Sequence, residues 1–256
     1  MTYDPDALDR RVPALIARLL PLVEWFNARY LRLRVEGGDQ LPDGPTLFVA
    51  NHNGGIMGPD LFCTLAFLWR RLGPHRPLYA LAHDFAMRQL TPLGRLLQQV
   101  GAIRATRANA ERALAAGGSV LVYPGGDLDA YRHFSRRNEV VLLPRTGFIK
   151  VAQAAGVPIV PLVAEGAHRS AIIFTEGQRL ARLLRLSRWA RLERFPVALA
   201  LPWIVAPGPW LPYLPLPLPI QLRVLPPIAV PPDAEPDELA REIQARMQRA
   251  LDEMAR

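Results

Sequence analysis

The chain has 256 residues, of which 50% are hydrophobic and 21% are charged, and it contains 26 prolines. This apolar content is enough for a sizeable core and excludes global disorder. The single cysteine, Cys63, excludes an intramolecular disulfide framework and a cysteine-rich zinc site, and its place in an apolar helix predicts that it is buried. The 31 basic residues outnumber the 23 acidic ones, which gives a net charge of +8. This excess leaves nucleic acid, an anionic membrane and a phosphorylated small molecule open as partners.

The N-terminal segment, residues 1–36, is expected to be helical and amphipathic. Apolar side chains recur close to a helical spacing from Val12 to Tyr30, and Pro21 is expected to kink or divide this helix. Two interpretations stay open, a helix packed on the protein body and a helix lying on a membrane surface. The acidic first residues precede no small-residue cleavage site, so no signal peptide is predicted and a cytoplasmic location is expected.

From residue 45 onward, strand-like and helix-like segments alternate along the chain. This alternation predicts an α/β sandwich, a single domain over residues 37–230 with a largely parallel central sheet flanked by helices. A C-terminal helix is expected within residues 231–256. The expected strands are 46–51, 78–81, 119–123, 157–163 and 220–225, and the expected helices are 60–71, 85–99 with an interruption at Pro92, 108–116 and 147–155.

Residues 178–219 combine an arginine-rich part with a proline-rich, apolar part. Arginine recurs at every third position from Arg179 to Arg194, which distributes the charges around a helix and leaves no apolar face. The uncharged stretch 195–222 contains too many prolines for a transmembrane helix. Its Trp203, Trp210 and Tyr213 are residue types that favour membrane interfaces. The segment is therefore predicted to contact an anionic membrane as part of a peripheral protein on its cytoplasmic face, with a solvated arginine segment and buried irregular structure as alternatives.

A chemically active loop is predicted where the strand at 46–51 ends. In α/β folds, residues at the carboxyl edge of the sheet form the site, and this loop carries a histidine, several glycines and a carboxylate. His52 can act as a general base at neutral pH, and Asp60 can hold its ring in the required tautomer. Gly54 and Gly55 can present backbone N–H groups to an oxyanion. Asp60 is alternatively only the N-cap of the next helix.

Two further segments extend this predicted site. A tight turn with a carboxylate follows the strand at 119–123, and it consists of Pro124, Gly125, Gly126 and Asp127. Arg104 and Arg107 lie just before the helix at 108–116, where arginines and a helix N-terminus together can bind an anion.

The order of these segments resembles the glycerolipid acyltransferase superfamily, the lysophosphatidate acyltransferase-like proteins. The resemblance covers residues 37–230. Its four blocks are Asn51, His52 and Asp60; Gly101, Ile103 and Arg107; Pro124, Gly125 and Gly126; and Val157, Pro158, Ile159 and Pro161. Seven residues instead of four separate His52 from Asp60, and Gly125 replaces a glutamate. Both departures, and the stretch that begins at Arg145, resemble the branch of mono- and diacylglycerol acyltransferases.

The resemblance implies direct transfer of an acyl group from an acyl thioester, acyl-coenzyme A or an acyl-carrier protein, to a hydroxyl of a glycerolipid or related lipid alcohol. His52 and Asp60 are then the catalytic pair, and no cofactor or metal is required. The implied substrate contacts are Asn51, Gly54, Gly55, Arg104, Arg107, Pro124, Gly125, Gly126, Asp127 and Arg145. The missing glutamate argues against a phosphate-bearing acceptor. A non-catalytic lipid-binding protein with the same fold is the second hypothesis, and nucleic-acid binding is not expected because no recognised module is present.

Overall fold

The computed structural model describes residues 3–55, 58–170, 172–189, 194–208 and 214–256. A seven-stranded sheet forms its centre, in the order β1-β10-β6-β2-β5-β3-β4. Its strands are β1 (Arg34–Gly37), β2 (Leu47–Ala50), β3 (Leu78–Ala82), β4 (Ala102–Arg104), β5 (Ser119–Val122), β6 (Ile159–Glu165) and β10 (Gln221–Val224). The strands from β6 to β4 run parallel, whereas β10 is antiparallel to β6 and parallel to β1. The expected α/β domain with a largely parallel sheet is confirmed.

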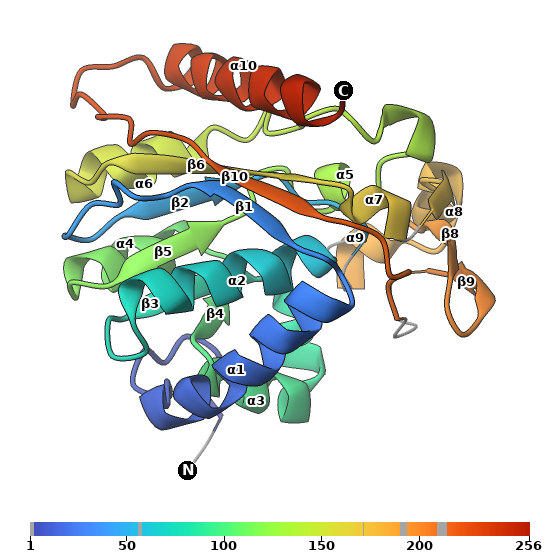
Figure 1. Ribbon diagram of the computed structural model, residues 1–256, viewed down its shortest axis with the longest axis horizontal. Helices are drawn as coiled ribbons and strands as arrows, with labels where there is room; N and C mark the ends of the chain where they lie inside the picture. Colours follow the sequence, from blue (N-terminus) through green and yellow to red (C-terminus); the bar gives the residue numbers. More distant parts are fainter. Residues whose placement is uncertain (1–2, 56–57, 171, 190–193, 209–213) are drawn as a thin grey trace.

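Helices cover both faces of this sheet, as Figure 1 shows. One face carries α1 (Pro13–Arg29) and α2 (Pro59–Leu72), and the other carries α4 (Arg107–Ala115), α6 (Gly147–Ala155) and α10 (Pro236–Met254). Successive side chains of β2 explain the three layers, because Phe48 packs with α1 and α2 whereas Val49 packs with α4, α6 and α10. The remaining helices are α3 (Thr91–Gln99), α5 (Gly126–Ala130), α7 (Ala167–Ser170), α8 (Gln178–Leu183) and α9 (Leu186–Trp189), with a π-helical turn at Phe85–Gln89 and a 3₁₀ turn at Phe134–Arg136.

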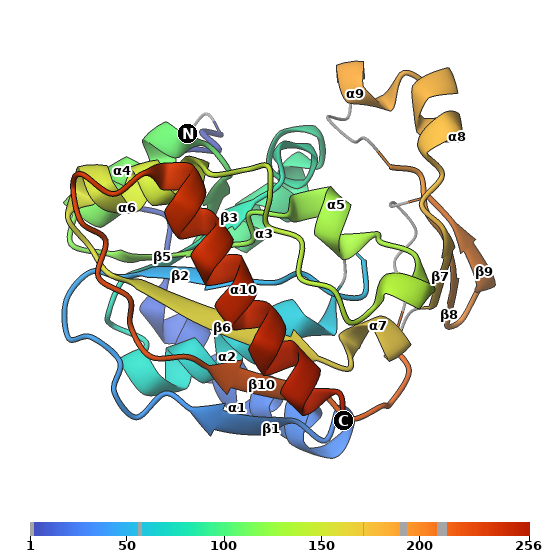
Figure 2. The same ribbon diagram turned by 90° about the horizontal axis from the view of Figure 1, so that it is seen from above.

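A second, smaller sheet projects from one end of this sandwich. It is antiparallel and contains β7 (Ile172–Thr175), β8 (Val197–Ala200) and β9 (Ile204–Pro207) in that order. Figure 2 shows the small sheet with α8 and α9 at the end of the molecule that lies away from α4 and α6. Because β7 follows β6 through α7, the small sheet begins at the edge where the parallel strands end. Among the helices that the structure describes, none is both long and apolar enough to cross a membrane.

The structure bears on two expectations about proline. Pro21 lies inside α1, which continues as a single helix, so the expected division into two helices does not occur. Because proline has no N–H, Pro21 leaves the carbonyl of Ala17 without its helical hydrogen bond. Both residues are exposed, so water can donate to that carbonyl instead. Within the described part of the proline-rich stretch, residues 197–200 and 204–207 form β8 and β9, whereas residues 215–220 have no regular secondary structure. The predictions for Arg191, Trp210 and Tyr213 lie outside the described residues.

The packed-helix interpretation of α1 is the one that the contacts support. Ile16 and Leu20 are buried in the core that α1 shares with α2. Leu22 and Trp25 remain on the open side of the helix, with exposed fractions of 61% and 62%.

Candidate active site

The loop after β2 brings His52 and Asp60 together. His52 Nδ1 lies 2.9 Å from Asp60 Oδ2, and the Asp60 side chain is fully buried. The same oxygen accepts the Asn53 N–H at 3.1 Å. The His52 side chain is 15% exposed. Because the ring contacts Asp60 through Nδ1, its Nε2 is the nitrogen left to accept a proton from a substrate. The predicted His52–Asp60 contact is therefore present across the longer spacing.

Glycines close the seven-residue gap between the two side chains. Gly54 and Gly55 adopt left-handed backbone conformations, with φ of 79° and 80°. A side chain at Gly58 would collide, because its Cβ would lie 2.2 Å from Asp60 Oδ1 and 2.5 Å from Asn53 O. Gly58, not Asp60, is the N-cap residue of α2, so the alternative that Asp60 only caps the helix is wrong.

The surroundings of His52 make it a stronger base than an ordinary histidine. Burial lowers its pKa, but the charge of Asp60, the hydrogen bond to Asp60 and the charge of Asp129 together raise the pKa above its usual value. The Tyr123 ring lies against the imidazole, with 4.7 Å between ring centroids. Cys63 is buried, which confirms the prediction, and burial strongly raises the pKa of its thiol, which disfavours the reactive thiolate.

The backbone N–H groups proposed for an oxyanion have other partners. The Gly54 N–H donates to His168 Nδ1 at 3.3 Å, and the Gly55 N–H donates to the Ala130 carbonyl at 2.9 Å. Both donors are thus used within the protein in this structure, and their role toward an oxyanion stays a prediction. Burial, with the charges of Arg132 and His52, holds the pKa of His168 well below its usual value, so this ring is neutral.

Asn51 ties two strands together and does not face a substrate. Its side chain is fully buried, with Oδ1 accepting the Ala164 N–H at 2.8 Å and Nδ2 donating to the Ala164 carbonyl at 3.0 Å. Asn53 Nδ2 donates to the same carbonyl at 2.7 Å. The two asparagines therefore fix the loop of His52 to the end of β6, and the predicted substrate contact of Asn51 is replaced by a structural one.

The predicted anion-binding arginines are paired elsewhere. Arg104 donates to Asp6 through Nε at 2.7 Å and contacts Asp84 at 3.4 Å. Arg107 is exposed and lies 2.6 Å from Glu111. Arg104 ends β4, the third strand from β2, so at a strand spacing of about 4.8 Å it lies roughly 14 Å to the side of the His52 loop. The structure does not bring these two residues to His52.

The turn after β5 gathers the residues predicted there. Arg145 Nη2 lies 3.0 Å from Asp127 Oδ1, and its Nη1 donates to the Gly125 carbonyl at 3.2 Å. The Arg145 guanidinium also occupies the space beside Gly126, where a Cβ would lie 2.4 Å from Nη1. Pro124 leads into this turn and is buried. The predicted cluster therefore exists, with the charges of Asp127 and Arg145 paired to each other.

Sequence reasoning missed an ion pair that contacts the His52 loop. Asp129 and Arg132 form an ion pair in which both side chains are fully buried, and both contact the main chain of His52. The available signal was a second aspartate two positions after Asp127, followed by an arginine at helical spacing.

The fold and the site define an α/β protein with a histidine–aspartate pair at the carboxyl end of a central strand. The chain belongs to the acyltransferase family, because the sequence pattern described as Acyltransferase matches residues 32–165, more than half of the chain.

The comparisons with individual proteins add relatives and a fold. Uncharacterized proteins of Mycobacterium tuberculosis and Mycobacterium leprae are 30% and 29% identical over 191 and 195 residues, which are 74% and 76% of this chain. The matched parts make up 53% of each, so the chain spans about half the length of these relatives. The crystal structure of the 1-acyl-sn-glycerophosphate (LPA) acyltransferase PlsC from Thermotoga maritima matches 93% of this chain and 80% of that chain, with a TM-score of 0.54 and 16% identity. This match confirms the fold.

Proposed function

We propose that this protein transfers a fatty acyl group from an acyl thioester to a hydroxyl of a glycerolipid or related lipid alcohol. The observation that carries the proposal is the 2.9 Å contact of a partly exposed His52 with a fully buried Asp60, in a chain of the acyltransferase family. A histidine with one nitrogen held by a carboxylate and the other directed to substrate is arranged for general-base catalysis.

In the proposed reaction, His52 Nε2 takes the proton of the acceptor hydroxyl while the hydroxyl oxygen attacks the thioester carbonyl carbon. Asp60 stabilises the imidazolium that forms. The tetrahedral intermediate then breaks its C–S bond, and His52 returns the proton to the leaving thiolate. An ester replaces a thioester, so the step needs no cofactor beyond the acyl-coenzyme A or acyl-carrier-protein donor.

Two observations favour an acceptor without a phosphate group. Arg104 is paired with Asp6 and Asp84 and ends a strand three positions away from β2, so it is not placed to bind the phosphate of an acceptor at His52. The glutamate of the third sequence block is replaced by Gly125, and no side chain fits at this position. A mono- or diacylglycerol is therefore the proposed acceptor class.

The experiment is incubation of the protein with labelled acyl-coenzyme A and a panel of lysophospholipids, monoacylglycerols and diacylglycerols. We expect labelled ester on the neutral acylglycerols and little on lysophosphatidate. Preference for lysophosphatidate would contradict the acceptor class. Binding of the lipids without consumption of thioester would contradict the catalytic proposal and favour the non-catalytic lipid-binding protein.

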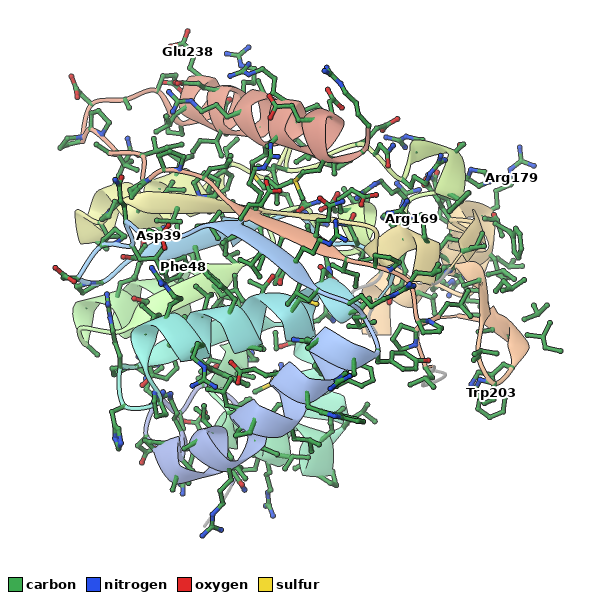
Figure 3. The ribbon with its side chains drawn as sticks, viewed as in Figure 1. Asp39, Phe48, Arg169, Arg179, Trp203 and Glu238 are labelled. Atoms are coloured by element: carbon green, nitrogen blue, oxygen red, sulfur yellow. The ribbon has the colours of Figure 1, made fainter. Side chains whose placement is uncertain are left out.

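We also propose that the small sheet and α8 bind an anionic membrane surface. Apolar side chains stay exposed on this projecting part, including Leu183 at 77%, Ile204 at 69% and Trp203 at 48%. Figure 3 places Trp203 and Arg179 at the outer end of the molecule, whereas Phe48 lies inside it. Exposed apolar groups of this size usually mark an interaction site.

The arginines of this part supply the charge that complements such a membrane. Arg179, Arg182, Arg185 and Arg188 are exposed, and within the described residues no ion pair involves them. Each arginine near an anionic surface contributes about 1 kcal/mol. Apolar side chains and arginines together favour a bilayer that contains anionic lipid over a neutral one.

Sedimentation with vesicles tests this surface. Wild-type protein should bind vesicles of phosphatidylcholine with phosphatidylserine, and replacing Arg179 and Arg182 by Gln should weaken binding about 30-fold at low salt. Trp203→Ala should weaken binding as well. Trp25→Ala, which removes a tryptophan of α1 that is more exposed than Trp203, is the control and should leave binding unchanged. Equal loss in Trp25→Ala, or binding that ignores lipid charge, would contradict the proposal.

A further inference from the structure

A fully buried ion pair lies directly behind the His52 loop. Asp129 of α5 and Arg132 just after it are in contact, and the exposed fraction of each side chain is 0%. Removing two charges from water is costly, so a buried pair is weak support for stability by itself. Its hydrogen-bond partners therefore indicate what the pair does.

The pair holds both polar groups of the His52 main chain. Asp129 Oδ2 accepts the His52 N–H, and Arg132 Nη1 donates to the His52 carbonyl at 3.2 Å. Arg132 Nη2 also donates to Asn53 Oδ1, and the Asn53 N–H in turn donates to Asp60 Oδ2. The network thus closes through the same carboxylate that holds the imidazole.

The opposite side of the pair is anchored to the C-terminal helix. Asp129 Oδ1 accepts the Val141 N–H at 3.1 Å. Gln248 of α10 accepts the N–H of residue 140, and Gln244 accepts those of residues 142 and 143, at 2.8 to 3.1 Å, so this segment is held from both sides. The His52 loop is therefore connected to a 19-residue helix through one carboxylate.

We propose that the Asp129–Arg132 pair is a positioning unit that fixes the main chain of His52 and thereby aims its imidazole at the substrate. The catalytic consequence rests on the proposed acyl transfer, whereas the positioning itself rests on the contacts above. Both residues act through the peptide groups of His52 and not on the reacting atoms. A misplacement of about 1 Å in such an arrangement can cost roughly 10²-fold in rate.

The charges of the pair give the proposal a signature that packing alone does not. Burial lowers the pKa of His52. The charges of Asp60 and Asp129 raise this pKa, and the charge of Arg132 lowers it. The other titratable groups close to the ring are His168 of α7, which is neutral, and Tyr123, whose ring is tilted against the imidazole. Asp129→Asn removes a charge that raises the pKa and leaves the guanidinium, which stays protonated. The pKa of His52 must then fall.

The test is an NMR titration of the His52 ring, assigned by the signal missing in His52→Ala, together with kcat for acyl transfer. In Asp129→Asn we expect the pKa of His52 to fall and kcat to fall about 10²-fold. In Arg132→Lys both charges remain, but one ammonium group replaces the guanidinium with its several N–H donors. The pKa of His52 should therefore stay near the wild-type value while kcat falls. The double variant D129N/R132M removes both charges, and its pKa should lie closer to wild type than that of Asp129→Asn. Glu176→Gln, which breaks a partly buried pair with Arg194, is the control whose His52 titration should not change.

The titration does not depend on activity, so the two proposals fail separately. An unchanged pKa of His52 in Asp129→Asn, with the protein folded, would overturn the positioning unit even if acyl transfer is found. Wild-type kcat in Arg132→Lys would overturn it as well. The absence of acyl transfer in the wild type, with the expected pKa changes, would contradict the proposed function and leave the fixing of the His52 main chain in place.

Discussion

Restoring the family's glutamate at position 125 should damage the protein instead of improving it. The backbone of Gly125 is helical, with φ of −63° and ψ of −28°, so conformation alone would accept any residue. Space would not, since a Cβ there would lie 2.0 Å from the Val141 carbonyl oxygen and 2.5 Å from Asp129 Cβ. Overpacking of this kind typically costs about 1–3 kcal/mol, and the rigid neighbours here place Gly125→Ala at the upper end of that range.

The assay is urea unfolding followed by circular dichroism, with the His52 titration as a second measurement. Gly125→Ala should lower the free energy of unfolding by about 3 kcal/mol, and Gly125→Glu by more, because it also pushes Asp129 away from the His52 N–H. Gly147→Ala is the control, since nothing lies within 4 Å of the added Cβ. A Gly125→Glu variant with wild-type stability and higher transfer activity would refute the steric reasoning.

Two further outcomes follow from the titrating groups. A base must be unprotonated to act, so kcat should rise with pH through the pKa of His52. Asp60→Asn removes the carboxylate that raises this pKa. The kcat–pH profile of this variant should therefore rise at a lower pH than that of wild type, with kcat reduced about 10²-fold or more. His168 has a folded-state pKa well below 6.5, so below about pH 6.5 the unfolded chain binds more protons and stability should fall by up to about 1.4 kcal/mol per pH unit. His168→Asn keeps an acceptor for the Gly54 N–H. Urea unfolding at pH 7.5 and 5.5 should show that its free energy of unfolding falls less between these two pH values than that of wild type. An equal fall in both proteins would show that His168 is not the group responsible.

The central strands β2 and β6 were predictable because they are buried on both faces. All four residues of β2 are buried, which produces the continuous apolar run that marks a parallel strand. β1 carries no such signal, since its four residues are all exposed, and β4 has only three residues. β8 and β9 were hidden by the prolines in and around them, since proline cannot donate a hydrogen bond to a sheet and its density there argued against strands.

The site was predictable only where its partners are local in the sequence. His52 and Asp60 share one loop, so their contact follows from the glycines between them. Asp127 and Asp129 are two positions apart on a helical turn, so their side chains point roughly 200° apart. Asp127 faces Arg145 and Asp129 contacts His52. The sequence pattern does not say which of the two aspartates contacts His52. One partner of Arg104 is Asp6, from a segment far away in the chain. Long-range pairs of this kind leave no mark in local spacing.

Single-turnover acyl transfer in His52→Ala tests the central claim most directly. Three proteins are compared: wild type, His52→Ala, and the control His75→Ala, which removes an exposed histidine outside the site. Each protein is mixed, in excess over the donor, with labelled acyl-coenzyme A and a diacylglycerol in vesicles. We predict a rate about 10²–10⁴-fold lower in His52→Ala at unchanged vesicle binding, and a wild-type rate in His75→Ala. Transfer at the wild-type rate by folded His52→Ala would contradict the claim that this histidine is the base.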